Sequence, residues 1–122
     1  MAEFSVAQRV YLSEQRLGRL ATVDPTGQPQ NNPVMFSLQD DGTILIGGHN
    51  MGASKKWRNL QANPKLSFVV DDVVSFRPWR ARFVEIRGTA ELLEGTTVLG
   101  AGFSSEVIRI HPEKIFSFGV DQ

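Results

Sequence analysis

The chain contains no cysteine, which excludes a disulfide framework and any chemistry that needs a thiolate. Its two histidines, His49 and His111, stand far apart without other ligands at a metal-binding spacing, so we expect no metal site. No nucleophile and base occur in a recognisable arrangement, and we therefore expect no catalytic side chain of the kind that a serine triad uses.

Long hydrophobic runs are missing as well. No segment approaches the roughly 18 apolar residues of a membrane span, and the N-terminus lacks the apolar stretch of a signal peptide. Basic and acidic side chains number 13 each, so net charge gives no reason to expect a nucleic acid or a membrane surface as a partner. The expectation is a cytoplasmic protein.

What the chain does contain is an ordinary globular composition. Its 122 residues, 41% of them hydrophobic, predict a single domain over residues 1–122. The core of such a domain is modest, and dimerisation would add to it.

Short strands account for most of the pattern. Hydrophobic alternation and turn residues predict strands over 19–24, 28–38, 43–48, 65–72, 82–93, 107–111 and 114–120. Six or seven strands joined mostly by hairpins predict a mainly β fold, a small antiparallel barrel. Side chains fill a barrel of this size, so a ligand would bind outside it, against a helix or a partner.

Two short helices are expected beside the strands. The first spans 5–15, where Ser5 and Gln8 form a capping box, and the second begins after Ser54. Loops are expected over 73–79 and 94–102.

The stretch 47–64 is the clearest candidate for a site. A glycine-rich turn precedes Ser54, a helix N-cap, and three cations follow in the first turns: Lys55, Lys56 and Arg58. A helix dipole disfavours cations at this end, and an anion bound between them and the free N–H groups would explain their presence. The alternative is a solvated face of a short amphipathic helix.

The strand over 28–38 has an unusual polar run, in which Asn32 precedes Pro33. Proline cannot donate to a sheet ladder, so this strand either lies at an edge or forms a bulge that turns backbone groups toward a ligand. For His49, two interpretations also remain: a surface histidine of the glycine turn, or a hydrogen-bond donor to a cofactor.

Five segments in order carry a resemblance to a known family. They are LATVDPTGQPQNNPV, IGGHNMGASKKWRNLQANP, VVDDV, PWRARFVEIRGTAEL and VIRIHPEKIFSFGVD. Together they resemble the pyridoxamine 5'-phosphate oxidase-like split-barrel superfamily. The resemblance is closest to its small actinobacterial group of flavin- or deazaflavin-dependent oxidoreductases.

The resemblance implies a homodimer of FMN-binding split barrels with two cofactor sites at the subunit interface. In the family the cofactor phosphate lies on residues matching 54–56, the backbone of residues 21–23 follows the ring, and residues 32–34 lie near its reactive face. The loop matching 78–82 approaches the site, from its own or from the other subunit. The candidate cofactor contacts are therefore Ala21, Thr22, Asn32, Pro33, Gly48, His49, Ser54, Lys55, Lys56, Arg58, Trp79 and Arg80.

Some features depart from true pyridoxamine phosphate oxidases. Phe83 stands where they have a glutamine, and the C-terminal FSFGVDQ lacks their substrate-phosphate motif. Oxidation of vitamin B6 is therefore not expected.

Several functions remain open. The first is an oxidoreductase that uses F420, a deazaflavin with an acidic tail, and transfers a hydride to a small hydrophobic or planar acceptor. Cations at Lys55, Lys56, Arg58 and in the segment 80–82 exceed what one phosphate needs, which favours this cofactor. The alternatives are an FMN-dependent oxidase or reductase, a flavin- or deazaflavin-binding protein without turnover, and a barrel whose basic cluster is only surface.

Overall fold

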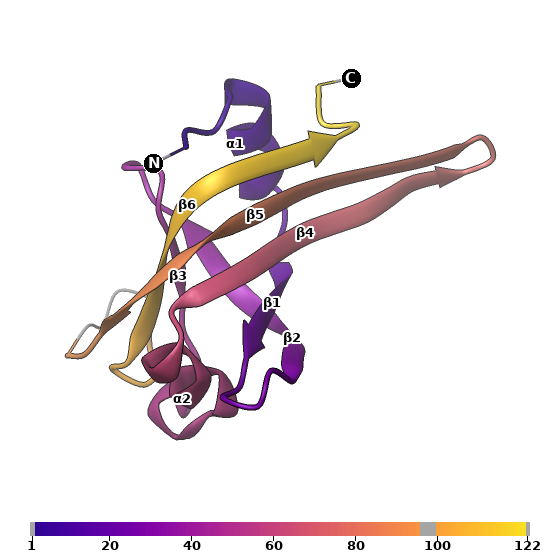
Figure 1. Cartoon of the computed structure of the whole chain (residues 1–122). Helices are drawn as coiled ribbons and strands as arrows, with labels where there is room; N and C mark the ends of the chain where they lie inside the picture. Colours follow the sequence, from indigo (N-terminus) through magenta and orange to yellow (C-terminus); the bar gives the residue numbers. More distant parts are fainter. Residues whose placement is uncertain (1, 96–99, 122) are drawn as a thin grey trace.

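A computed structural model of the chain describes residues 2–95 and 100–121. Six antiparallel strands close into a barrel in the order β1-β2-β3-β6-β5-β4, as Figure 1 shows. This confirms the expected antiparallel barrel with two short α-helices. The elements are α1 (Val6–Ser13), β1 (Leu17–Val23), β2 (Pro29–Leu38), β3 (Ile44–Ile46), η1 (Met51–Ala53), α2 (Lys55–Ala62), β4 (Lys65–Phe76), β5 (Trp79–Leu93) and β6 (Val107–Phe118).

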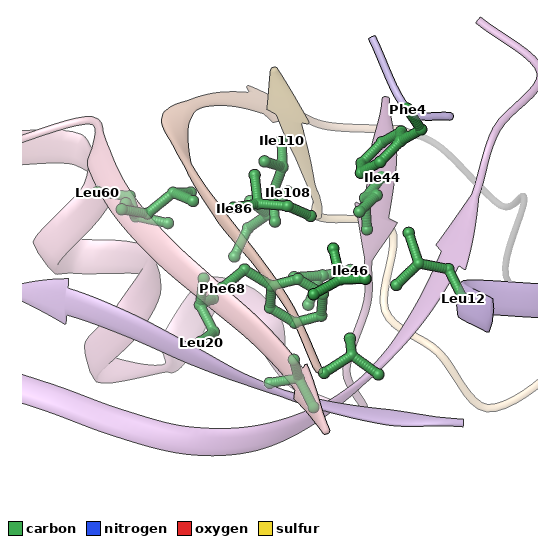
Figure 2. Close-up of a cluster of buried hydrophobic side chains, with 14 of the residues drawn as sticks. Phe4, Leu12, Leu20, Ile44, Ile46, Leu60, Phe68, Ile86, Ile108 and Ile110 are labelled. Carbon is green, nitrogen blue, oxygen red and sulfur yellow. The ribbon is translucent and has the colours of Figure 1, made fainter. Parts of the chain in front are cut away.

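The core lies inside the barrel, and the two helices supply side chains to it. Alternate residues of β4, such as Phe68, point inward and pack against β1, β3, β5 and β6 (Figure 2). Gly18 of β1 is needed here, because a Cβ at this position would overlap the Phe68 ring. Tyr11 and Leu12 of α1 and Leu60 of α2 are also buried in this cluster.

The largest difference from the sequence prediction lies between β4 and β5. The loop expected over 73–79 is mostly strand: β4 continues to Phe76, which pairs with Trp79 at the start of β5. The irregular hydrophobic pattern there reflects a register shift between Val73 and Ser75. We call residues 73–81 the arm, because this hairpin extends away from the barrel (Figure 1).

The C-terminal strand also differs from the prediction. The segments 107–111 and 114–120, expected as two strands about a turn, are joined in the single strand β6. Arg87 pairs with Lys114 and Gly88 pairs with Pro112, so the register shifts by one residue, Glu113. This shift lets the strand continue without a turn. Gly88 allows this close approach, since a Cβ there would overlap the His111 carbonyl oxygen. The loop expected over 94–102 includes residues 96–99, which lie outside the described residues.

The pairing of β2 distinguishes between the two interpretations of its polar run, an edge and a bulge. Residues 29–35 pair with β1 in unbroken register, and only residues 36–38 pair with β3. The expected edge is therefore confirmed and the expected bulge is wrong. Pro33 is tolerated because one side of the strand has no partner at this point.

A polar cluster fixes α1 to the base of the arm. The Tyr11 hydroxyl donates to Asp72 Oδ1 over 2.8 Å, and Arg82 donates to both carboxylate oxygens of Asp72 over 3.0 and 2.7 Å. The Arg82 hydrogen bonds hold the pKa of Asp72 below its ordinary value, whereas burial and the Asp72 carboxylate raise the pKa of Tyr11. Within residues 2–95 and 100–121, no helix is long and apolar enough to cross a membrane.

Candidate functional site

The start of α2 presents donors toward the outside of the barrel. Ser54 caps the helix, since its Oγ accepts from the N–H of Trp57 over 3.2 Å and donates to the Met51 carbonyl over 2.7 Å. The N–H groups of Lys55 and Lys56 lie in the first turn of the helix, where no carbonyl of the helix can accept from them. They remain available for an anion, whereas the Ser54 hydroxyl already makes two hydrogen bonds.

Lys55 is held toward the turn between β1 and β2. Its Nζ lies 3.9 Å from Asp24 Oδ2, and the lysine side chain is 48% exposed. The other carboxylate oxygen of Asp24 accepts from the N–H and hydroxyl of Thr26 and from the N–H of Gln28. These hydrogen bonds, with a smaller contribution from Lys55, lower the pKa of Asp24. The carboxylate therefore partly neutralises the charge of Lys55.

A buried amide joins α2 to the barrel wall behind this site. Asn59 Nδ2 donates to Thr22 Oγ1 over 3.0 Å and to Gln30 Oε1 over 3.4 Å. Asn59 and Thr22 are each 1% exposed. Asn59 and Gln30 were not among the predicted site residues, although a polar residue between the apolar Trp57 and Leu60 is visible in the sequence.

β1 offers backbone groups next to the helix start. Ala21 is its last residue to pair with β4, opposite Ser67, and beyond it the strand pairs only with β2. The β4 side of the backbone at Thr22 is thus unpaired, while the Thr22 side chain is used by Asn59. Asn32 and Pro33 lie across from Leu20 and Arg19, where β1 also pairs with β4 on its other side.

The glycine turn before α2 is fastened to a second loop. His49 Nδ1 lies 2.7 Å from the Gly102 carbonyl oxygen, and its ring stacks on Phe103 with centroids 5.4 Å apart. A carbonyl oxygen only accepts, so Nδ1 carries a proton and Nε2 is the nitrogen left for other contacts. The Ser104 N–H and hydroxyl both donate to the Gly48 carbonyl. This geometry gives His49 a structural contact.

Arg58 also has a partner in the chain. Its Nη1 donates to the Ala53 carbonyl over 3.0 Å, and the side chain stays exposed. The guanidinium is therefore kept near the helix start, one turn from the lysines.

Trp79 and Arg80 are not brought to this site within one protomer. Both are exposed on the arm, and Figure 1 places the end of the arm far from α2. Most of the other predicted residues lie around the start of α2 and the end of β1, whereas Asn32 and Pro33 lie farther along β2, opposite Leu20 and Arg19.

The donor set fits the phosphate of a flavin-type cofactor. Two N–H groups at the beginning of an eight-residue helix and two lysine side chains provide both the directed hydrogen bonds and the charge that a phosphate requires. The unpaired edge of β1 adds main-chain groups beside them.

Comparison with known proteins gives a consistent answer. The pyridoxamine 5'-phosphate oxidase family matches residues 5–118 of this chain. A 5a,11a-dehydrotetracycline/5a,11a-dehydrooxytetracycline reductase of Streptomyces rimosus is 42% identical over 120 residues, which cover 97% of this chain and 84% of that protein.

Solved structures share the fold. A conserved hypothetical protein of Mycobacterium tuberculosis superposes with a TM-score of 0.77 at 22% identity, covering 96% of this chain and 86% of the other. An F420 reductase superposes with a TM-score of 0.65 at 25% identity, covering 83% and 89% of the two chains. The chain therefore belongs to the pyridoxamine 5'-phosphate oxidase-like split-barrel superfamily, as the order of its sequence segments indicated.

Proposed function

We propose that this protein is an oxidoreductase that binds the deazaflavin F420 and transfers a hydride to a small hydrophobic or planar organic acceptor. The observation that carries the proposal is the pair of lysines at the open start of α2, beside the unpaired edge of β1. Both the Streptomyces relative and one structural neighbour are reductases by name.

In this proposal the bound cofactor supplies the hydride chemistry, and the chain supplies position and charge. The N–H groups and side chains of Lys55 and Lys56 would hold the phosphate. The main chain of Ala21 and Thr22 would contact the ring, and Asn32 and Pro33 would lie near its reactive face.

The cations around the site favour F420 over FMN. Arg58 is exposed one turn beyond the lysines, and its contact with Ala53 keeps it close to the helix start. One phosphate does not need this third cation, whereas the acidic tail of F420 provides a partner for it. FMN in the same site, with or without turnover, is the alternative.

A homodimer would complete the site. Phe76 and Trp79 on the arm are 75% and 64% exposed, and Phe118 on the neighbouring strand is 62% exposed. Aromatic surface of this kind on a protruding hairpin is typical of an interface. A partner's arm would bring a second copy of Trp79 and Arg80 to the α2 site. Sedimentation velocity at micromolar concentration should show a dimer, and a stable monomer would contradict this part of the proposal.

Side-by-side fluorescence titrations with F420 and FMN test the cofactor. We expect saturable binding of F420 that is tighter than that of FMN, followed by oxidation of reduced F420 when an acceptor is added. Binding of FMN alone would select the alternative, and binding of neither would refute the proposed function.

A further inference from the structure

The buried contact between α2 and β1 has no explanation in hydrophobic packing. Asn59 reaches Thr22 and Gln30 from the helix, although Trp57 and Leu60 already anchor α2 in the core. Apolar contacts are not directional, whereas a buried amide must meet its partners at a fixed distance and angle. A polar contact at this position therefore sets the rotation of α2 about its axis and its position along β1.

We propose that Asn59 is a positioning residue for the anion site, holding the start of α2 in register with the end of β1. The inference rests on the proposed function, because the site is taken to bind the phosphate of the cofactor. No ligand contact by Asn59 itself is involved.

The helix geometry connects Asn59 to the lysine. Lys55 and Asn59 are four residues apart, so they lie on the same face of α2. The amide faces the barrel wall, and the same face carries Lys55 to within 3.9 Å of Asp24. A rotation of α2 that released the amide would also turn Lys55 away from the end of β1.

The spacing of the two contacts agrees with this role. Thr22 and Asp24 are two residues apart in an extended segment, a separation of about 6.6 Å at 3.3 Å per residue. Lys55 and Asn59 are four residues apart in a helix, a separation of about 6 Å at 1.5 Å per residue. The segments run in opposite directions, so the contacts Thr22 to Asn59 and Asp24 to Lys55 form two matched ties between strand and helix.

The test compares Asn59→Ala with Thr22→Val, which removes the acceptor from the other side, and with Leu60→Ala as the control. Leu60 is 2% exposed on the same helix, so its truncation destabilises the protein without touching the tie. Each variant is studied well below its own melting temperature. Two readouts are taken: the affinity for F420 and FMN, and the amide NMR signals and hydrogen exchange of Lys55 and Lys56 without ligand.

We expect Asn59→Ala and Thr22→Val each to weaken binding by about tenfold, the effect of misaligning one charge-assisted hydrogen bond. Both should shift the Lys55 and Lys56 amide signals and speed their exchange, whereas Leu60→Ala should leave affinity within about twofold. The double variant Thr22→Val/Asn59→Ala should bind no more weakly than Asn59→Ala alone, because both changes break the same contact.

Unchanged amide signals and affinity in Asn59→Ala and Thr22→Val would overturn the inference, as would an equal loss in Leu60→Ala. If the wild-type protein bound neither cofactor, the proposed function would fail. The amide signals of the ligand-free variants would still decide whether Asn59 positions the helix start.

Discussion

Replacing both Lys55 and Lys56 by alanine tests the anion site at its centre. If the two side chains hold a phosphate, the double variant loses two charge-assisted hydrogen bonds, while the helix N–H groups and the β1 edge remain.

The surroundings of Lys55 and Lys56 predict different contributions of the two side chains to cofactor binding. Lys55 is 48% exposed and faces Asp24, so solvent and the carboxylate both reduce what it contributes to an anion. We expect Lys55→Ala to weaken cofactor binding by about tenfold. Lys56 is less exposed and makes no ion pair within the described part of the chain, so its loss should weaken binding more, by up to about a hundredfold.

Stability should change little in the double variant. The lysines stand at the end of the helix dipole that disfavours cations, and the ion pair between Lys55 and Asp24 is long, with its lysine half-exposed. Thermal unfolding followed by circular dichroism checks this, and fluorescence titration with F420 and FMN measures affinity.

A matched control carries the same change of net charge elsewhere. Lys65 and Lys114 are exposed on β4 and β6, so Lys65→Ala/Lys114→Ala should bind cofactor like the wild type. Equal affinities of the wild type and the Lys55→Ala/Lys56→Ala variant would refute the reasoning. An equal loss in the control would show that only long-range charge matters.

Three further predictions follow from the same geometry. Asp24→Asn keeps an oxygen for Thr26 and Gln28 but removes the charge beside Lys55, so cofactor affinity measured by titration should rise by about twofold to fivefold. Arg58→Ala should weaken F420 binding and spare FMN, in the same titrations, because only the tail of F420 needs the third cation. Asp72→Ala should lower the free energy of unfolding in urea at pH 7 by about 1.5–3 kcal/mol. The pKa of Asp72 is depressed in the folded protein, so its contribution is present above the unfolded value of about 4 and lost as pH falls below it. Unfolding of the variant should therefore depend less on pH below about 4 than that of the wild type.

The arm shows where sequence patterns lose information. Hydrophobic alternation identified residues 65–72 as a strand because one face of β4 is buried there. Beyond Asp72 the hairpin leaves the barrel, both faces meet solvent, and the period of two disappears from the sequence although the pairing continues to Phe76.

The prediction of two strands in place of β6 was wrong for a different reason. Pro112 and the residues around it read locally as a turn, yet the strand continues because Gly88 on β5 accepts the extra residue. That accommodation depends on a partner far away in the sequence, which a local pattern does not contain.

The same limit of local patterns explains why only part of the candidate site could be predicted. The glycine turn, the Ser54 cap and the lysines are neighbours in sequence, and the cap is confirmed by the hydrogen bond from Trp57. Asn59 depends on Thr22, 37 residues earlier, so only the folded chain shows what it contacts.

The location of the cofactor phosphate tests the central claim most directly. A crystal structure of the protein with F420, or with FMN if that binds more tightly, should place the phosphate within hydrogen-bond distance of the main-chain N–H groups of Lys55 and Lys56 and of their ammonium groups. The ring should lie along the edge of β1 at Ala21 and Thr22. A phosphate bound elsewhere, with the start of α2 in contact only with solvent, would contradict the account.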